Sequence, residues 1–455
     1  MLILALILLA GGPDLNATNS TVNKPVNIGI VGLGTVGGGA LHLLRANAAE
    51  LSRRTGRDIV VSHIGVRREH PNLDLAGITV SMDIFAVVDD PAVDIVVEVI
   101  GGITVARELV LRAIANGKHV VTANKWLLAE HGNEIFTAAE AKGVHVGFEA
   151  SVAGGVPIIK VLREGLAANN IEWLAGIING TGNYILTEMR DKGRSFTDAL
   201  DEAKALGYAE ADPTFDVEGI DAAHKLTIMA SLAFGIPLQF SKVYTEGLSQ
   251  LTRDDVIYAE ELGFRIKQLG MARYTREGVE LRVHPTLIPN DRLIAHVNGV
   301  KNAILVQSDA VGTTMYYGAG AGAGPTASAV VADIVDLVRL LTSESAPNVP
   351  HLAFMPHAIT NTPILPMESV VTSYYLRLQA YDRAGVLADV TRILSNHDIN
   401  IEAILQKPMQ EGGSVPVIIL TKPVVEREMS LAMIELEALD HIIGSVTRIR
   451  MESLA

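Results

Sequence analysis

The chain of 455 residues contains no cysteine. Disulfide bonds, zinc sites with thiolate ligands and catalysis by a thiol nucleophile are therefore excluded. A chain without disulfides suits the reducing conditions of the cytosol, so we expect a cytoplasmic protein.

The chain has fewer basic than acidic residues. The chain has 37 lysine and arginine residues against 51 aspartate and glutamate residues, which gives a net charge of −14. Nucleic acids and anionic membranes attract basic surfaces, so neither is expected as a partner. With 49% hydrophobic and 19% charged residues the chain is globular rather than disordered. Its length predicts about two to four domains.

The apolar run at the start of the chain, MLILALILLA, is only ten residues long. A bilayer needs about 20 apolar residues, so this run is too short to span one. A secretory signal begins with basic residues, whereas the first basic residue here is Lys24. Asn16 and Asn19 match the glycosylation pattern, but such matches are common in a polar linker. We expect residues 1–23 to be an extension outside the fold.

A glycine-rich turn follows the first apolar strand, residues 26–31. The motif Gly32-x-Gly34-x-x-Gly37 stands directly after this strand and opens a helical pattern. Glycines at these positions permit a tight turn and let the backbone approach a pyrophosphate at the helix N-terminus. In this strand–turn–helix context the motif predicts a dinucleotide-binding domain of the Rossmann type.

The second predicted strand, residues 58–66, ends in Arg67 and Arg68. An acidic residue at this tip binds the ribose hydroxyls of NAD, whereas arginine suits the 2′-phosphate of NADP. The alternative is a solvated basic loop, because the spacing exceeds that of the simplest fingerprint. NADP is the expected cofactor, with NAD left open.

Further buried strands are predicted at residues 93–100, 119–122 and 144–150. Doubly wound parallel sheets bind ligands at the carboxyl ends of their strands. Thr122, Asn124 and Lys125 follow such a strand and are expected to face the crevice. This domain spans residues 24–150, and an apolar helix within residues 319–345 is expected to return and pack against it.

An acidic stretch, Gly207–Leu226, precedes a nearly all-apolar segment. A helix beginning near Ile220 places Asp221 and Lys225 four residues apart, on one face. Such a pair is commonly solvated, but this helix is otherwise apolar and acids crowd its entrance. A lysine held beside carboxylates can transfer a proton to a developing alkoxide, so this is the predicted active site.

The remaining chain predicts two more domains. Residues 151–318 mix helices and strands, as in an α+β catalytic and dimerisation domain built around a sheet. Residues 346–370 are rich in proline and form a linker. Residues 371–455 follow the order βαββαβ, a ferredoxin-like arrangement. The fold class is therefore α/β, with a Rossmann-type doubly wound parallel sheet.

Seven motifs together resemble the homoserine dehydrogenase family in its longer form, which carries a C-terminal ACT regulatory domain. They are GLGTVGGG at 32–39, VEVIGG at 97–102, VTANK at 121–125, EASVAGGVPII at 149–159, NGTGNYIL at 179–186, the stretch 207–226, and YYGAGAGAGPTASAVVAD at 316–333. The ACT likeness lies in DRAGVLADVTRIL, and the resemblance covers residues from about 26 to 455.

The resemblance implies an NAD(P)-dependent oxidoreductase that interconverts L-homoserine and L-aspartate 4-semialdehyde in threonine, methionine and isoleucine biosynthesis. Lys225 would exchange the proton, with Asp221 and Lys125 completing the polar site. Glu210 and Asp216 would hold the substrate's ammonium group. The implied cofactor contacts are Gly34, Thr35, Val36, Arg67, Lys125 and Gly322.

The resemblance also implies a structural sodium ion and an effector site. The sodium would be held through Glu149 and the carbonyl groups of Val152, Gly154 and Val156. A small amino acid, with L-threonine the natural candidate, would inhibit by binding near Asp382, Gly385 and Asn400. The alternative is that the ACT segment serves only in oligomerisation. A homodimer or homotetramer is expected.

One residue departs from the family pattern, and two other functions stay open. Trp126 stands directly after Lys125, where a small residue is expected. Its ring either crowds the nicotinamide pocket or faces the core. The competing functions are a related amino-acid semialdehyde reductase and a catalytically silent sensor that binds an amino acid and NADP. The intact set of Asp221, Lys225 and Lys125 argues against the sensor.

Overall fold

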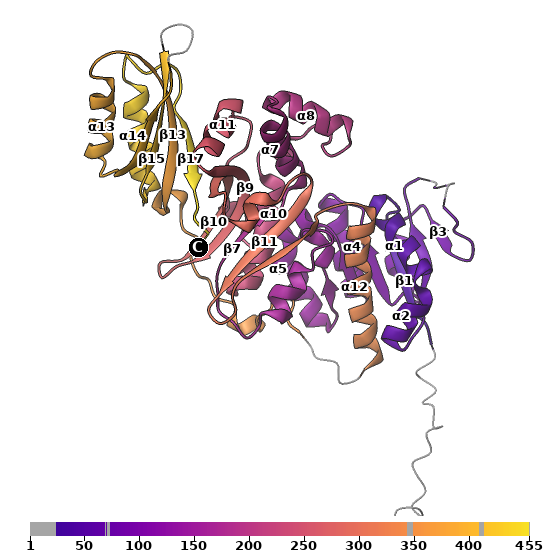
Figure 1. The fold of residues 1–455 in the computed structure, drawn as a ribbon. Helices are drawn as coiled ribbons and strands as arrows, with labels where there is room; N and C mark the ends of the chain where they lie inside the picture. The colour runs from indigo at the N-terminus through magenta and orange to yellow at the C-terminus, as the bar shows by residue number, and fades with distance from the viewer. Residues whose placement is uncertain (1–23, 69, 71–72, 344–348, 409–413, 455) are drawn as a thin grey trace, which may run out of the picture.

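A computed structural model describes residues 24–68, 70, 73–343, 349–408 and 414–454. The expected extension, residues 1–23, lies outside the described residues, as do Asn16 and Asn19. Figure 1 shows three parts in a row, with the N-terminal elements at one end and the C-terminal elements at the other.

The N-terminal part is a six-stranded parallel sheet with the strand order β3-β2-β1-β4-β5-β6. This order reverses between β1 and β4, as in a doubly wound Rossmann-type sheet, so the predicted fold class is confirmed. Most residues of β1, β4 and β5 are buried because helices cover both faces of the sheet. The strands are β1 (Val26–Val31), β2 (Ile59–Gly65), β3 (Thr79–Ser81), β4 (Ile95–Glu98), β5 (His119–Thr122) and β6 (Val146–Gly147).

One of the covering helices comes from much later in the chain. Helix α12 (Ala323–Thr342) lies beside the N-terminal elements in Figure 1 and packs on α1. Val330, Ile334 and Val338 of α12 share a buried core with Leu41 and Leu44 of α1. The other helices are α1 (Thr35–Ala46), α2 (Ala48–Thr55), α3 (Phe85–Asp89), α4 (Thr104–Ala115) and α5 (Lys125–Lys142).

The central part builds half of an eleven-stranded sheet, in the order β12-β11-β7-β9-β10. Strand β9 was not predicted, because charged residues interrupt its apolar pattern. The strands are β7 (Ile171–Ile177), β8 (Tyr244–Thr245), β9 (Phe264–Tyr274), β10 (Val279–Pro289), β11 (Lys301–Ser308) and β12 (Gly312–Ala319). The helical elements are η1 (Glu149–Ser151), α6 (Ile158–Lys160), η2 (Val161–Gly165), α7 (Gly180–Lys192), α8 (Phe196–Ala205), α9 (Thr214–Val217), α10 (Ile220–Phe234), η3 (Phe240–Lys242), α11 (Arg253–Glu261) and η4 (Leu293–His296).

The C-terminal part has the predicted βαββαβ order, with the strands arranged β17-β13-β15-β14. Its elements are β13 (Val371–Tyr381), α13 (Val386–Asn396), β14 (Ile401–Gln406), β15 (Ser414–Thr421), β16 (Val424–Val425), α14 (Glu426–Glu437) and β17 (Thr447–Met451). Strand β17 pairs with β13 on one side and with β10 on the other. The C-terminal strands therefore continue the central sheet, which was not predicted.

The proline-rich segment predicted as a linker packs along the central part where it is described, with the short turns η5 (Pro356–Ala358) and η6 (Met367–Ser369). The Val279 N–H donates to the Pro363 carbonyl at 2.9 Å, and the Thr360 N–H donates to the Gly235 carbonyl at 2.9 Å. The Phe354 ring covers Gly235 so closely that an added Cβ would lie 2.9 Å from it.

Two histidines complete the hydrogen bonds at the edge of the N-terminal sheet. The Val146 N–H on β6 donates to His351 Nε2 at 3.0 Å, and the neighbouring His145 N–H donates to His119 Nδ1 at 3.0 Å. Both imidazoles accept, so both must be neutral at these nitrogens. Burial lowers the pKa of His351 to about 3 and that of His119 to about 4, which keeps them neutral at pH 7.

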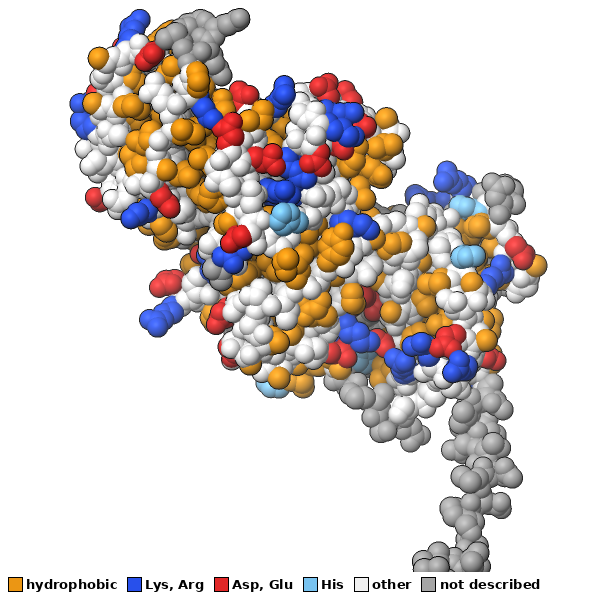
Figure 2. Space-filling view, viewed as in Figure 1, with side chains coloured by type: hydrophobic (Ala, Val, Ile, Leu, Met, Phe, Trp, Pro, Cys, Tyr) orange, Lys and Arg blue, Asp and Glu red, His pale blue; other side chains and the backbone are white. Residues whose placement is uncertain are grey.

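The surface carries charges of both signs. Figure 2 shows lysine, arginine, aspartate and glutamate side chains intermingled over the visible face. This distribution agrees with the net charge of −14 and offers no extended basic surface on that face. Within the described part of the chain, no helix has the length and apolar composition required to cross a membrane.

Replacing His351 by glutamine is expected to make stability less dependent on pH. The histidine pKa is near 6.5 in the unfolded chain and about 3 in the folded one. The folded form therefore binds fewer protons between these values, and stability falls as pH drops below about 6.5, by at most about 1.4 kcal/mol per pH unit. Thermal unfolding at pH 7.5 and 5.0 should show a smaller difference for His351→Gln than for the wild type.

The matched control is His357→Gln, which changes an exposed histidine of the same segment. It should retain the wild-type pH dependence. A His351→Gln protein with the full wild-type loss at pH 5.0 would contradict this role of the edge histidine.

Candidate functional site

The site is built at the start of α10, the helix predicted from Ile220. Gly219 stands at its N-cap with φ 81°, a conformation that favours glycine. Nearly all of α10 is buried, so its polar residues need partners. Asp221 and Lys225 find partners on α5 of the N-terminal part and at the end of β7, whereas the ring nitrogens of His224 have no hydrogen bond within the described chain.

Asp221 is the centre of the site and binds two lysines. Its Oδ2 accepts from Lys225 Nζ at 2.7 Å, one turn later on α10, and its Oδ1 forms an ion pair with Lys125 Nζ at 3.1 Å. Lys225 Nζ also donates to the Ile178 carbonyl at 2.7 Å. An ammonium group has three donors, so Lys225 has one N–H left for a ligand.

Burial and the neighbouring opposite charges shift the pKa values of Asp221 and of the two lysines in opposite directions. Burial alone would raise the pKa of the Asp221 carboxyl, but Lys225 and Lys125 outweigh it and hold this pKa well below its usual value. Burial lowers the pKa of Lys225 despite the neighbouring carboxylate, whereas Asp221 raises the pKa of Lys125. Asp221 is therefore ionised, and Lys225 is the lysine whose proton is held less tightly.

Asn179 joins two carboxylates, although no role was predicted for it from the sequence. Its Nδ2 donates to Asp221 Oδ2 at 2.8 Å and to Asp216 Oδ1 at 2.7 Å. Its Oδ1 accepts from the Gly182 N–H at 2.7 Å and caps α7. The motif NGTGNYIL carried a signal for this residue, because Asn before a Gly-rich helix start is a common N-cap.

The two carboxylates predicted to bind substrate differ in position. Asp216 lies beside Asp221, and burial raises the pKa of its carboxyl. Glu210 is exposed and forms no hydrogen bond or ion pair within the described chain. Its charge nevertheless helps to raise the pKa of Lys125, so it lies near the same pocket.

Lys125 reaches Asp221 from the carboxyl edge of the parallel sheet. It is the first residue of α5, whose N-cap Asn124 accepts from the Leu127 N–H at 3.1 Å and donates to the Gly102 carbonyl at 2.7 Å. Behind it, the fully buried Glu98 accepts from Thr122 Oγ1 at 2.6 Å. Thr122 thus ties β5 to β4 and does not face the crevice, contrary to the prediction.

The glycine-rich turn opens onto a cavity of 590 Å³. Gly32 has φ 102°, and a Cβ on Gly37 would lie 1.9 Å from the Gly32 carbonyl oxygen, so both positions require glycine. A Cβ on Gly34 would meet nothing within 4 Å, which leaves room for a ligand there. The cavity therefore fits the pyrophosphate expected at the N-terminus of α1.

The other predicted cofactor residues are distributed around this turn. Arg67, together with Arg68, lines the cavity. Thr35 and Val36 form the first turn of α1. Gly322 is the N-cap of α12, and the cavity lining does not include it or Lys125.

The segment predicted to hold sodium is a tight turn. Ala153 and Gly154 have φ 54° and φ 50°, and both are buried. Each oxygen of the Glu149 carboxylate accepts a backbone N–H, from Ile159 at 2.9 Å and Lys160 at 2.8 Å. The Glu149 side chain is thereby tied to the start of α6, and each of its oxygens keeps one further lone pair.

Trp126 packs on the central part. Its ring lies 5.3 Å from Phe215 and 6.1 Å from His224, measured between ring centroids. His224 is fully buried beside Phe240 as well, and burial lowers its pKa to about 4. The ring of Trp126 therefore lies against aromatic residues on α10 and just before it.

The predicted effector residues stand in two turns of the C-terminal part. Asp382 and Gly385 lie between β13 and α13, and Gly385 has φ 97° at the N-cap of α13. Asn400 precedes β14, and its carbonyl accepts from the Lys422 N–H at 2.8 Å. All three residues are exposed.

Family models match most of the chain. The model for "Homoserine dehydrogenase, NAD binding domain" matches residues 32–149, that for "Homoserine dehydrogenase" matches residues 157–335, and that for "ACT domain" matches residues 374–436.

Known proteins are similar over nearly the full length. A homoserine dehydrogenase from Pseudomonas aeruginosa is 63% identical over 95% of this chain and 100% of its own length. The crystal structure of a homoserine dehydrogenase from Thiobacillus denitrificans is 62% identical, with a TM-score of 0.90, over 95% of this chain and 99% of that one. A hyperthermophilic archaeal homoserine dehydrogenase in complex with NADPH is 27% identical, with a TM-score of 0.59, over 72% of this chain and 100% of that one.

Two alanine substitutions in the glycine-rich turn should have different effects. Gly37→Ala places a Cβ 1.9 Å from a carbonyl oxygen, so the turn must open and the melting temperature should fall. Gly34→Ala meets nothing within 4 Å, so the fold should keep its stability. Its methyl group would still obstruct a pyrophosphate, and dinucleotide affinity should fall about tenfold or more. Calorimetric unfolding and binding titrations measure both effects, and unchanged affinity in Gly34→Ala would contradict this location of the pyrophosphate.

Proposed function

The chain belongs to the homoserine dehydrogenase family, and from this premise we propose a role for each polar residue of the site. The enzyme is an oxidoreductase with an NAD-binding domain. In our proposal Lys225 exchanges the hydroxyl proton of L-homoserine, and Asp221 and Lys125 fix its position and charge. The observation that carries this proposal is the ion-paired cluster of Lys225, Asp221 and the half-buried Lys125, in which Lys225 retains one donor.

Oxidation of L-homoserine to L-aspartate 4-semialdehyde removes a hydride from carbon and a proton from oxygen. When bound, the nicotinamide supplies or accepts the hydride. In its neutral form Lys225 takes the proton of the hydroxyl group, and in the reverse direction its ammonium group returns that proton to the carbonyl oxygen. The lowered pKa of Lys225 favours this exchange, because a catalytic group works best with a pKa near the working pH.

Asp221 keeps the site charged without touching the substrate. Its Oδ2 already accepts from Lys225 and Asn179, and its Oδ1 pairs with Lys125. It therefore orients Lys225 and stabilises the ammonium form that proton uptake creates.

The substrate's own ammonium group calls for carboxylates. Asp216, turned toward the cluster by Asn179, and the exposed Glu210 nearby are the proposed partners. Ion pairs of this kind distinguish an amino acid from an uncharged alcohol of the same size.

NADP is the proposed cofactor, because Arg67 and Arg68 line the cavity at the tip of β2 where a 2′-phosphate is recognised. The archaeal relative in complex with NADPH supports the same choice. Gly32, Gly34, Thr35, Val36, Gly37 and Gly322 complete the proposed set, together with Lys125. The ratio of kcat/KM for NADP⁺ and NAD⁺ decides between the two cofactors.

A sodium ion is proposed at the turn after Glu149. The carbonyl oxygens of Val152 and Gly154 accept no hydrogen bond from the described residues, although both residues are buried. The third carbonyl of the predicted set, that of Val156, accepts from the Ile158 N–H at 2.7 Å. Buried carbonyl oxygens without donors fit a hard cation, which takes oxygen ligands. Turnover in buffers containing only sodium or only potassium ions tests this site.

The proposal extends to assembly and place in metabolism. The eleven-stranded sheet ends in β12 and β14, whose open edges suit pairing into a homodimer or homotetramer. Sedimentation velocity measures that state. The enzyme would act in the cytoplasm, in the pathway to threonine, methionine and isoleucine.

Replacing Lys225 by arginine tests the proton transfer. Arginine keeps the positive charge that Asp221 needs but cannot give up its proton, so the fold should survive while kcat falls about 10²- to 10⁴-fold. The assay follows NADP⁺ reduction with L-homoserine. Lys142→Arg makes the same change in an exposed residue at the far end of α5 and should leave turnover intact. Turnover of Lys225→Arg within tenfold of the wild type would contradict the assigned role.

L-Threonine is proposed as a feedback inhibitor that binds at the turn between β13 and α13. Asp382 would pair with its ammonium group, and the N-terminus of α13 would receive its carboxylate. Asp382→Asn should therefore raise the threonine concentration for half-inhibition about tenfold. Asp440→Asn changes another exposed carboxylate of the same part and serves as the control. Equal inhibition of Asp382→Asn and the wild type would contradict binding at this turn.

A further inference from the structure

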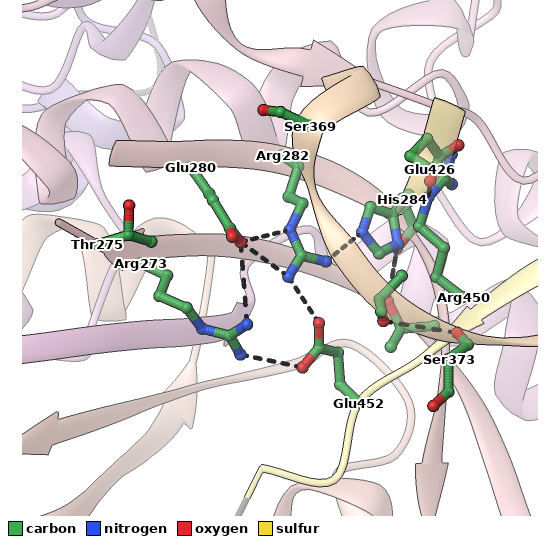
Figure 3. A network of polar contacts seen from close by, with 12 residues as sticks. Arg273, Thr275, Glu280, Arg282, His284, Ser369, Ser373, Glu426, Arg450 and Glu452 are labelled. Atoms are coloured by element: carbon green, nitrogen blue, oxygen red, sulfur yellow. Dashed lines mark hydrogen bonds and ion pairs between the residues drawn. The ribbon is translucent and has the colours of Figure 1, made fainter. Parts of the chain in front are cut away.

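A group of buried ion pairs lies where β17 meets the central sheet (Figure 3). Two arginines at this junction, Arg282 on β10 and Arg450 on β17, are almost completely buried. A buried charge without a partner is costly, so each must be neutralised locally. Each arginine is neutralised by the carboxylates of its own cluster. The two clusters contact different residues of the central part.

The first cluster is formed by Arg450, Glu426, Glu246 and Tyr244. Arg450 donates to both oxygens of Glu426, at 2.9 and 2.6 Å, within the C-terminal part. Its Nη1 donates to Glu246 Oε2 at 2.7 Å, and Glu246 belongs to the central part. Tyr244 receives Arg450 Nη2 at 3.2 Å and donates to Glu246 Oε2 at 2.8 Å.

Glu246 lies next to the turn that follows Asp216, the carboxylate proposed to bind the substrate. Two residues further on, the Leu248 N–H donates to the Val217 carbonyl at 2.9 Å. A Cβ on Gly247 would lie 2.2 Å from Glu218 Oε2, and one on Gly219 would lie 3.7 Å from the Glu246 carbonyl oxygen. Residues 246–248 therefore lie along residues 217–219.

Residues 217–219 connect the two carboxylates of the site. Asp216 directly precedes them, and Asp221 follows at the start of α10. Asn179 holds both carboxylates at 2.7 and 2.8 Å, so a shift of this turn changes their spacing. The path from Arg450 to Asp216 thus consists of one ion pair, to Glu246, and of the contacts between residues 246–248 and residues 217–219.

We propose that Glu246, held by Arg450 of the C-terminal part, is a positioning residue of the substrate site and the link through which the ACT part controls substrate binding. This inference rests on the proposed roles of Asp216 and of threonine. It adds a specific route between them. Neither residue touches the substrate, so the expected effect is on the KM for L-homoserine and not on the proton transfer.

The second cluster provides the control. Arg282 binds Glu452 at 2.6 Å and Glu280 at 3.2 Å, and Arg273 binds Glu452 at 3.1 Å. This cluster also joins the C-terminal segment to the central sheet, as Figure 3 shows. Its members lie on β9, on β10 and directly after β17, and their side chains make no hydrogen bond to residues 246–248 or 217–219 within the described chain. One backbone link is present, because the Glu246 N–H donates to the Val283 carbonyl, next to Arg282, at 2.8 Å. Losing a charge here loosens the same junction without removing a side-chain contact of residues 246–248 or 217–219.

The experiment compares Glu246→Gln with Glu280→Gln in the full-length enzyme. Both substitutions remove one negative charge from one cluster and keep the side-chain shape. Glu246→Gln should raise the KM for L-homoserine about fivefold or more and leave kcat within about twofold. The threonine concentration for half-inhibition should change by a similar factor. Glu280→Gln should lower the melting temperature comparably but leave the KM near the wild-type value.

Several outcomes would overturn the inference. An unchanged KM in a folded Glu246→Gln protein excludes the positioning role. Equal KM changes in both variants indicate general loosening of the junction and exclude a specific route. A raised KM with an unaltered threonine response supports the positioning role and excludes the regulatory link.

The experiment also distinguishes a wrong choice of threonine as effector from a wrong role of Glu246. A wild-type enzyme that neither binds nor responds to threonine contradicts the effector, and the KM comparison then still decides the positioning role. As a second variant, Tyr244→Phe removes only the hydroxyl group that donates to Glu246, and it should raise the KM in the same direction but less. No change in either variant would overturn the proposal.

Discussion

The structure depends on one buried carboxylate, Asp221, held ionised between two ammonium groups. Lys225 belongs to the same helix, whereas Lys125 comes from the N-terminal part, so the ion pairs also fix one part of the molecule against the other. Removing one partner of such a buried group costs about 3–5 kcal/mol, because a charge is left uncompensated. Burial lowers the pKa of Lys225, and the same charges of Asp221 and Lys125 that hold α10 against α5 act on that pKa in opposite directions.

Features encoded by short stretches of sequence could be predicted. The glycine turn, the parallel strands and the spacing of Asp221 and Lys225 depend on neighbours within a few residues. Only the family resemblance placed Asp221 and Lys125 in one site, and the role of Asn179 was not predicted at all, because these partners lie far apart in the chain. Strand β9 was missed for a related reason. Lys267 and Gln268 interrupt its apolar pattern, yet both are buried through contacts that only the folded sheet provides.

The C-terminal part is not a separate module, because the proline-rich segment and the last strand both join it to the central part. Residues 349–370 lie against the central part through backbone hydrogen bonds and the ring of Phe354, and against β6 of the N-terminal sheet through His351. Composition indicated a linker but not this packing. Strand β17 completes one sheet while extending another. The C-terminal strands are therefore joined to β10 by main-chain pairing as well as by side-chain charges.

The return of α12 to the first sheet has a consequence for synthesis. The chain of the dinucleotide-binding part emerges from the ribosome up to residue 150 well before α12, which supplies the partners of Leu41 and Leu44. At about 5–20 residues per second, the intervening roughly 180 residues take about 10–40 s to make. During that interval the apolar face of α1 is uncovered. The first sheet therefore cannot complete its core until the helix that closes this face has been translated.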